Sequence, residues 1–131
     1  MLPKKVFIVD DDKIFHFIIR KLLAKQNPNV ELVFFENGLD AIERLRTKIG
    51  TDQRFPDIIL LDINMPVLDG WQFLDEFRAI KPHLARMPEI YLVSSSDNSA
   101  DRDRALDYGD EVVAYYLKPM GEEQITKIFL N

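Results

Sequence analysis

Charged and hydroxyl side chains follow the ends of four apolar runs in this chain. Asp10 and Asp11 follow the first of these runs, and Asp62, Ser94 and Lys118 follow the other three. If the runs are strands of one parallel sheet, their carboxyl ends share an edge, and we expect these side chains to meet there. Carboxylates crowded at one corner repel each other, and a divalent cation that prefers oxygen ligands, such as Mg2+, would relieve the repulsion. With a lysine and a hydroxyl beside it, the set suits phosphoryl transfer, which depends on positioning and charge neutralisation.

Short apolar runs predict five strands, and apolar residues at helical spacing predict a helix after each strand. The strands are expected at residues 6–9, 30–35, 57–61, 90–93 and 112–117. The helices are expected around residues 14–23, 39–49, 71–80, 100–108 and 125–129. Strict alternation implies an α/β fold with a doubly wound, five-stranded parallel sheet. A flavodoxin-like strand order 2-1-3-4-5 would place the first and third strands side by side, roughly 4.8 Å apart.

Other polar residues have simpler structural interpretations. Asp12 is expected to cap the first helix, and Gly109 is expected to end the fourth as its C-cap. His16 and His83 invite a phosphorelay role, but isolated histidines in such settings are more often surface groups, and we interpret them so. The aromatic residues of the third helix are expected in the core, namely Trp71, Phe73 and Phe77.

Composition argues against several classes of function. The 131 residues suffice for one domain with a full core, and 47% hydrophobic and 30% charged residues are typical of a globular protein. A net charge of -5 without a Lys/Arg cluster argues against nucleic acid or an anionic membrane as a partner. The chain has no cysteine, which excludes disulfides and thiol chemistry. The first apolar run is too short for a secretory signal, so we expect a cytoplasmic location.

The motifs at the predicted strand ends occur together and in order. They are Val9-Asp10-Asp11, Asp62 with Met65-Pro66 and Asp69-Gly70, Ser94, and Lys118-Pro119. In this combination the chain resembles a response-regulator receiver domain of two-component signal transduction, of the chemotaxis-regulator-like, single-domain kind. The resemblance covers essentially the whole length, so we expect one receiver domain over residues 1–131 and no output domain.

The resemblance implies a phosphorylation site and a metal site. Asp62 would be the phosphoacceptor, which takes a phosphoryl group from a histidine kinase or a phosphotransfer protein and becomes an acyl phosphate. Asp11, Asp62 and the backbone carbonyl of Asn64 would hold Mg2+, with Asp10 nearby through water. Such a domain is a phosphoprotein that catalyses only its own phosphorylation and dephosphorylation.

The resemblance also implies a switch. Lys118 would pair with the phosphoryl group, and the Lys118-Pro119 peptide bond would be cis. Ser94 would bond a phosphoryl oxygen and move on activation, coupled to Tyr115 as the switch aromatic. Tyr116 is the other candidate for that role, since adjacent strand residues face opposite sides of a sheet. A separate, unidentified downstream protein would read the result.

Two alternatives stay open at this point. The chain could be a pseudo-receiver, an interaction scaffold that is never phosphorylated. It could also be a Mg2+-dependent phosphohydrolase that forms a transient aspartyl phosphate on Asp62. Enzymes of that kind generally use a second acid beside the nucleophile to protonate the leaving group, and Asn64 at the neighbouring position cannot do so.

Overall fold

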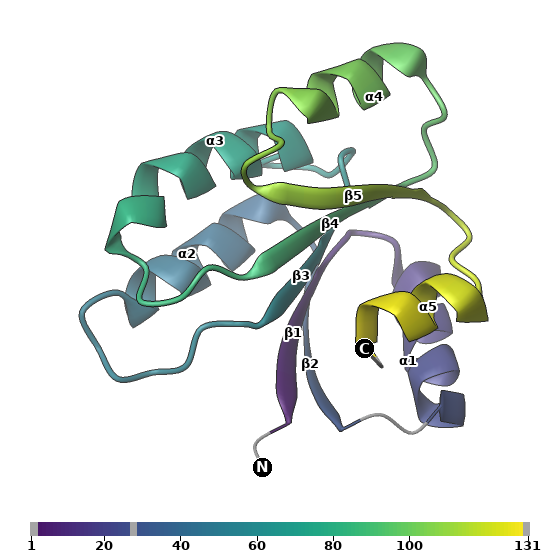
Figure 1. The fold of residues 1–131 in the computed structure, drawn as a ribbon, viewed down its shortest axis with the longest axis horizontal. Coiled ribbons are helices and arrows are strands. Elements are labelled where there is room, and N and C mark those ends of the chain that lie inside the picture. Colours follow the sequence, from purple (N-terminus) through teal and green to yellow (C-terminus); the bar gives the residue numbers. More distant parts are fainter. Residues whose placement is uncertain (1–2, 27–28, 130–131) are drawn as a thin grey trace.

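The computed structural model describes residues 3–26 and 29–129, which form one five-stranded parallel sheet with helices on both faces (Figure 1). The strands are β1 (Lys4–Val9), β2 (Val30–Phe35), β3 (Ile58–Leu61), β4 (Glu89–Ser94) and β5 (Val112–Leu117). The helices are α1 (Lys13–Gln26), α2 (Gly38–Lys48), α3 (Gly70–Ile80), α4 (Ser99–Leu106) and α5 (Glu122–Phe129), with a short 3-10 helix at Lys81–His83. The strand order is β2-β1-β3-β4-β5, so the predicted fold class and order are confirmed.

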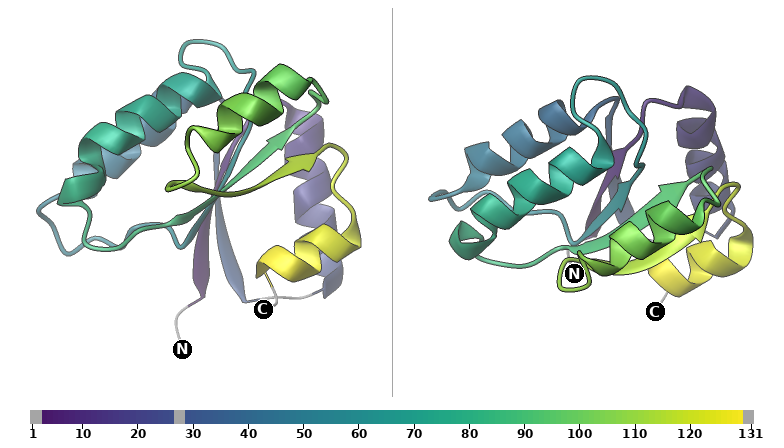
Figure 2. Two further views of the ribbon diagram at one scale, coloured as in Figure 1. Left: turned by 45° about the horizontal axis from the view of Figure 1, so that its top comes forward. Right: turned by 90° about the horizontal axis from the view of Figure 1, so that it is seen from above.

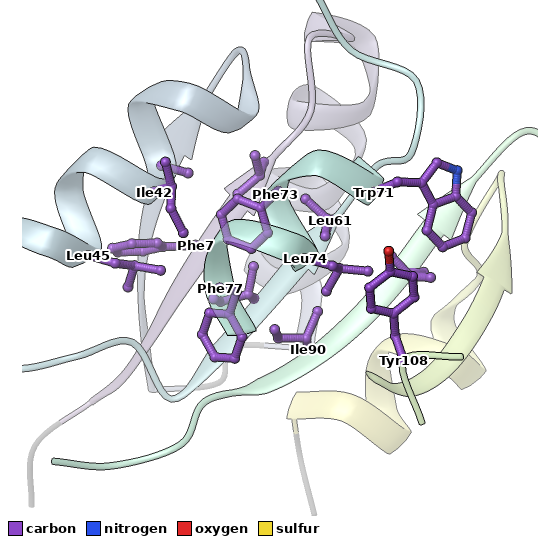
Figure 3. Close-up of a cluster of buried hydrophobic side chains, with 14 of the residues drawn as sticks. Phe7, Ile42, Leu45, Leu61, Trp71, Phe73, Leu74, Phe77, Ile90 and Tyr108 are labelled. Atoms are coloured by element: carbon purple, nitrogen blue, oxygen red, sulfur yellow. The ribbon is translucent and has the colours of Figure 1, made fainter. Parts of the chain in front are cut away.

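The sheet separates two hydrophobic layers. Helices α1 and α5 cover one face and α2, α3 and α4 the other, as the turned views show (Figure 2). The second layer holds the aromatic residues of α3, which are buried as predicted and pack with residues of β1, α2 and β4 (Figure 3). The four residues of β3 are all buried, because both faces of this central strand are covered.

Strand register brings the predicted site residues to one edge. Val9 pairs with Leu61, so Asp10 and Asp62 leave adjacent strands at the same level. The Asp62 N–H donates to the Val9 carbonyl at 2.9 Å, which continues this pairing by one residue. Ser94 pairs with Leu117 at the ends of β4 and β5, and Lys118 follows directly. The carboxyl edge of the sheet therefore gathers these side chains, as the alternating pattern predicts.

Two predictions about local structure are wrong. Gly109 does not cap α4, because the helix ends at Leu106 and its C-cap residue Asp107 keeps a right-handed backbone, with φ at -66°. His16 is buried rather than on the surface, since it lies on the face of α1 that packs against the sheet, and its ring is 4.8 Å from that of Phe34. Among the described residues, no helix is both long and apolar enough to cross a membrane.

Candidate functional site

The loop after β3 places Asp62 at the carboxyl edge and holds its backbone tightly. The Asp62 Oδ1 atom accepts a hydrogen bond from the Ile63 N–H at 2.8 Å. Gly70 begins α3 and donates its N–H to the Ile63 carbonyl, also at 2.8 Å. A Cβ atom at Gly70 would lie 2.5 Å from the Asp62 carbonyl oxygen, so only glycine allows α3 to start this close. Asp69 caps α3 in a capping box with Gln72.

Asp10, Asp11 and Asp62 form the acidic cluster of the structure. One carboxylate oxygen from each lies within 4.8 Å of the other two. Asp10 and Asp62 are buried and Asp11 is exposed, so the cluster opens to solvent on one side. Asp12 lies outside it and caps α1, because its Oδ1 accepts the Ile14 N–H at 2.9 Å, as predicted.

Lys118 supplies the positive charge beside these carboxylates. Its Nζ atom is 2.6 Å from Asp10 Oδ2 and 3.7 Å from Asp62 Oδ2. The same ammonium group lies 4.7 Å from the centre of the Phe15 ring, a cation–π contact that helps to hold it in place. The Lys118-Pro119 peptide bond is cis, as the resemblance implies. Lys118 is therefore held between the two buried carboxylates, closer to Asp10.

The cluster is electrostatically unbalanced. Burial and the neighbouring charge of Asp10 raise the pKa of Asp62 to about 6, although Lys118 and two backbone N–H groups act in the opposite direction. Burial also raises the pKa of Asp10, in spite of the Lys118 contact. Two buried carboxylates share one lysine, so the site as built has a deficit of positive charge.

The donor set fits a hard divalent cation. Asp10 Oδ2 is buried, and its partner among the described residues is the Lys118 ammonium, 2.6 Å away as an ion pair. Three carboxylates within ligand reach of one another, one of them open to solvent, are oxygen donors of the kind that Mg2+ uses together with water. Asn64 lies two residues after Asp62 with its side chain exposed, and the role of its carbonyl stays a prediction.

Ser94 on β4 and Tyr115 on β5 are both hydrogen-bonded to Ser96, in the loop between β4 and α4. Ser94 is fully buried at the end of β4, and its Oγ accepts the Ser96 N–H at 3.1 Å. The Tyr115 hydroxyl donates to the Ser96 carbonyl at 2.8 Å, which joins β5 to the loop between β4 and α4. Tyr115 packs on the α3 side of the sheet and Tyr116 on the opposite side. Of the two tyrosines, Tyr115 is the one bonded to the loop beside Ser94.

Three contacts of the site were missed by sequence reasoning. They are the Gly70 approach to the Asp62 backbone, the Phe15 ring beside Lys118, and the bonds from Ser96 and Asp97 to helix α4. Gly70 carried a signal, since a glycine at the start of a helix commonly marks a close backbone approach. The other two join segments far apart in the sequence or depend on the rotamers of exposed side chains.

These features define a class of protein: a doubly wound α/β domain whose carboxyl edge carries an acidic, metal-capable corner beside a lysine and a hydroxyl. The family model for the response regulator receiver domain matches residues 6–130. The chain therefore belongs to the response-regulator receiver-domain family of two-component signalling.

Individual relatives agree with this assignment. The response regulator Rcp1 of Synechocystis is 29% identical over 115 residues, which are 87% of this chain and 70% of Rcp1. The probable transcriptional regulator ycf29 of Porphyra purpurea is 29% identical over 126 residues, and there the chain spans 96% of its own length but 54% of the relative. The structure of the phosphorylated cyanobacterial phytochrome response regulator RcpA superposes with a TM-score of 0.80 at 28% identity, over 98% of this chain and 95% of that one.

Proposed function

We propose that this receiver domain is a phosphoacceptor signalling module and that Asp62 is the residue that is phosphorylated. The supporting observation is the position of Asp62, buried at the carboxyl edge with its Oδ2 atom 3.7 Å from the Lys118 ammonium and with carboxylate oxygens of Asp10 and Asp11 within 4.8 Å. A carboxylate oxygen of Asp62 attacks the phosphorus of a phosphohistidine, the P–N bond breaks, and the electron pair returns to the imidazole ring. The donor is a histidine kinase or a phosphotransfer protein.

Each neighbouring side chain then has a distinct task. Asp11, Asp62 and the Asn64 carbonyl would hold Mg2+, with Asp10 nearby through water, and the bound metal would neutralise charge on the transferred phosphoryl group. Lys118, 3.7 Å from Asp62 Oδ2, pairs with a phosphoryl oxygen. Ser94 moves to donate its hydroxyl to another oxygen, and the loop around Ser96 shifts with it. Tyr115, bonded to that loop at 2.8 Å, moves with it.

A separate protein reads the phosphorylated state. The hollow between α4 and β5, of about 330 Å³, has Tyr115 and Arg102 in its lining, so a change at the loop reaches an accessible surface. Leu106 and Val113 also line it and are 77% and 55% exposed, which offers a partner apolar contacts.

Intact mass spectrometry after incubation with acetyl phosphate tests the proposal. We expect one added phosphoryl group in the native chain with Mg2+, none with EDTA, and none in Asp62→Asn. Asp52→Asn, which removes an exposed carboxylate from the loop at the amino end of β3, the opposite end of the strand from Asp62, is the matched control and keeps the adduct. An adduct that persists in Asp62→Asn would assign phosphorylation to another residue.

The two alternatives predict different results in the same experiment. A pseudo-receiver gives no adduct and releases no phosphate, even where calorimetry shows that Mg2+ binds. A phosphohydrolase releases phosphate continuously from a generic phosphomonoester. The proposed module forms the adduct but does not hydrolyse the phosphomonoester, because its turnover is limited to its own acyl phosphate.

A further inference from the structure

The loop between β4 and α4 carries a network of side chains that the proposed roles of Ser94 and Tyr115 do not use. Ser96 Oγ donates to Asp101 Oδ2 at 2.6 Å, which ties the loop to the first turn of α4. The Asn98 N–H donates to Ser96 Oγ at 3.3 Å, and Asn98 caps the helix. The loop that presents Ser94 is thus joined to α4 through Ser96.

Arg102 covers the Tyr115 ring from α4. Its guanidinium carbon lies 5.2 Å from the ring centre, within the range of a cation–π contact. The Nε and Nη2 atoms of Arg102 both donate to Asp97 Oδ1, at 3.2 and 3.0 Å. Asp97 belongs to the same loop whose Ser96 carbonyl accepts the Tyr115 hydroxyl. Arg102 therefore contacts the switch aromatic and the loop to which it is bonded.

We propose that Arg102, anchored by Asp97, is a positioning residue that holds Tyr115 on the Ser96 carbonyl and so keeps the β4–α4 loop closed before any phosphoryl group is present. Loop closure by Arg102 does not depend on phosphorylation, but its consequence for signalling rests on the proposed function. A closed loop keeps Ser94 in place, so a phosphodonor meets a site that is partly organised in advance.

The size of the effect follows from exposure. The side chains of Arg102 and Asp97 are 45% and 74% exposed, and such contacts are weak one by one. A cation–π contact and an exposed ion pair together shift a two-state population by about fivefold. Arg102 consequently adjusts the balance between open and closed loops rather than fixing it.

Helix α4 offers a matched control. Arg104 lies two residues further on and also covers an aromatic ring, with its guanidinium carbon 4.8 Å from the Trp71 ring. Replacement of Arg104 by alanine removes the same charge and the same kind of contact from the same helix. It leaves the Tyr115 contact intact.

Backbone amide NMR of the unphosphorylated full chain tests the positioning role. Tyr115→Phe removes the hydroxyl bonded to Ser96 and defines the direction in which the Ser94 and Lys118 amide signals move when the loop is released. We expect Arg102→Ala and Asp97→Asn to move both signals in that direction, by a smaller amount, and Arg104→Ala to leave them unchanged. If Arg102→Ala leaves these signals in place, or moves them no more than Arg104→Ala, the positioning role is wrong.

Phosphorylation kinetics give the second readout. The initial rate with acetyl phosphate should fall about fivefold in Arg102→Ala and less than twofold in Arg104→Ala. In the Tyr115→Phe background, the effect of Arg102→Ala on the rate should shrink. Both residues act through the hydrogen bond from the Tyr115 hydroxyl to the Ser96 carbonyl, which Tyr115→Phe has already removed. Equal effects of Arg102→Ala in both backgrounds would overturn the positioning role. A native chain that takes no phosphoryl group would refute the proposed function, and the NMR comparison would still decide the role of Arg102.

Discussion

Two buried ionic sites lie in opposite electrostatic conditions in this domain. At the carboxyl edge, Asp10 and Asp62 share Lys118, so two carboxylates meet one cation. On the α3 side of the sheet, Glu111 lies just before β5 and accepts hydrogen bonds from Arg78 Nε at 2.9 Å and from Lys81 Nζ at 2.8 Å. One carboxylate there pairs with two cations. Burial raises the pKa of Asp62 to about 6. Burial acts on Glu111 as well, but the hydrogen bonds from Lys81 and Arg78 outweigh it and lower the pKa of Glu111.

The difference separates a structural site from a reactive one. Glu111 joins the C-terminal end of α3 and the following 3-10 helix to the start of β5, and every charge there has a partner. Asp62 shares its cation, Lys118, with Asp10, so the chain bears an electrostatic cost at this corner. An unbalanced site persists when a ligand that restores the balance is part of its function, and a divalent cation would restore the balance at this corner.

The largest expected effect is at Glu111, whose carboxylate has two cationic partners. Glu111→Gln should lower the free energy of unfolding at pH 7 by about 2 kcal/mol, because it removes the buried negative charge and replaces one of the two acceptor oxygens that face Arg78 and Lys81 with an amide donor. Urea denaturation measures the change. Glu123→Gln, an exposed substitution on α5, is the control and should stay within about 0.5 kcal/mol of the native chain.

The pH dependence of this effect has a defined sign. The folded pKa of Glu111 is lowered from 4.5, so its contribution is fully present above that value and is lost as pH falls through the lower, folded pKa. The cost of Glu111→Gln should therefore shrink in acid. A cost that stays constant down to pH 3 would show that packing, not charge, makes Glu111 important.

The same kind of substitution at the unbalanced site should act in the opposite direction. In EDTA at pH 7.5, Asp62→Asn should raise the free energy of unfolding by about 1–2 kcal/mol, because it removes a carboxylate whose pKa is raised in the folded state. The folded pKa of about 6 lies above the reference value of 3.8, so the penalty grows as pH rises from about 4 to 6 and is complete above that range.

The stability gained by Asp62→Asn should consequently fade toward pH 4. It should also fall when Mg2+ is added, since the metal stabilises the chain that keeps the Asp62 carboxylate and not the variant. Denaturation of both proteins at pH 4.5 and 7.5, with and without Mg2+, measures these differences. Asp52→Asn serves again as an exposed carboxylate control. Destabilisation by Asp62→Asn in metal-free buffer at pH 7.5 would contradict the electrostatic comparison of the two sites.

Much of this architecture was predictable from the sequence because it depends on local pattern. The strands at residues 30–35 and 112–117 have the predicted bounds, since each is an apolar run bounded by polar or turn residues. Convergence of Asp10, Asp62 and Lys118 follows from parallel strands that end at one edge. The burial of His16 could have been predicted from its position next to Phe15 on a helix face that also holds Ile19.

The remaining features depend on where distant side chains meet. Nothing in the spacing of Lys118 shows that it lies nearer to Asp10 than to Asp62, because that choice is made by the course of the chain after β5. The Arg102 contact with Tyr115 likewise requires α4 to start at Ser99 and to lie along β5. Such contacts have no periodic signature in the sequence.

The smallest expected effect concerns Lys118, the cation that the two carboxylates share. Its ammonium group would repel a divalent cation bound at the same corner. Lys118→Met should therefore still bind Mg2+, with an affinity about threefold higher. Isothermal titration calorimetry at low ionic strength measures the change, and Lys118→Arg, which keeps the charge, should bind as the native chain does.

Acceptance of a phosphoryl group by Lys118→Met should be slower, and the Ser94 and Tyr115 signals should respond less to it, since the phosphoryl oxygen loses its cationic partner. Loss of Mg2+ binding in Lys118→Met would mean that Lys118 instead holds Asp10 and Asp62 in place for the metal. The unbalanced corner would then be a preformed ion-pair network like that of Glu111, and the distinction between the two sites would fail at Lys118.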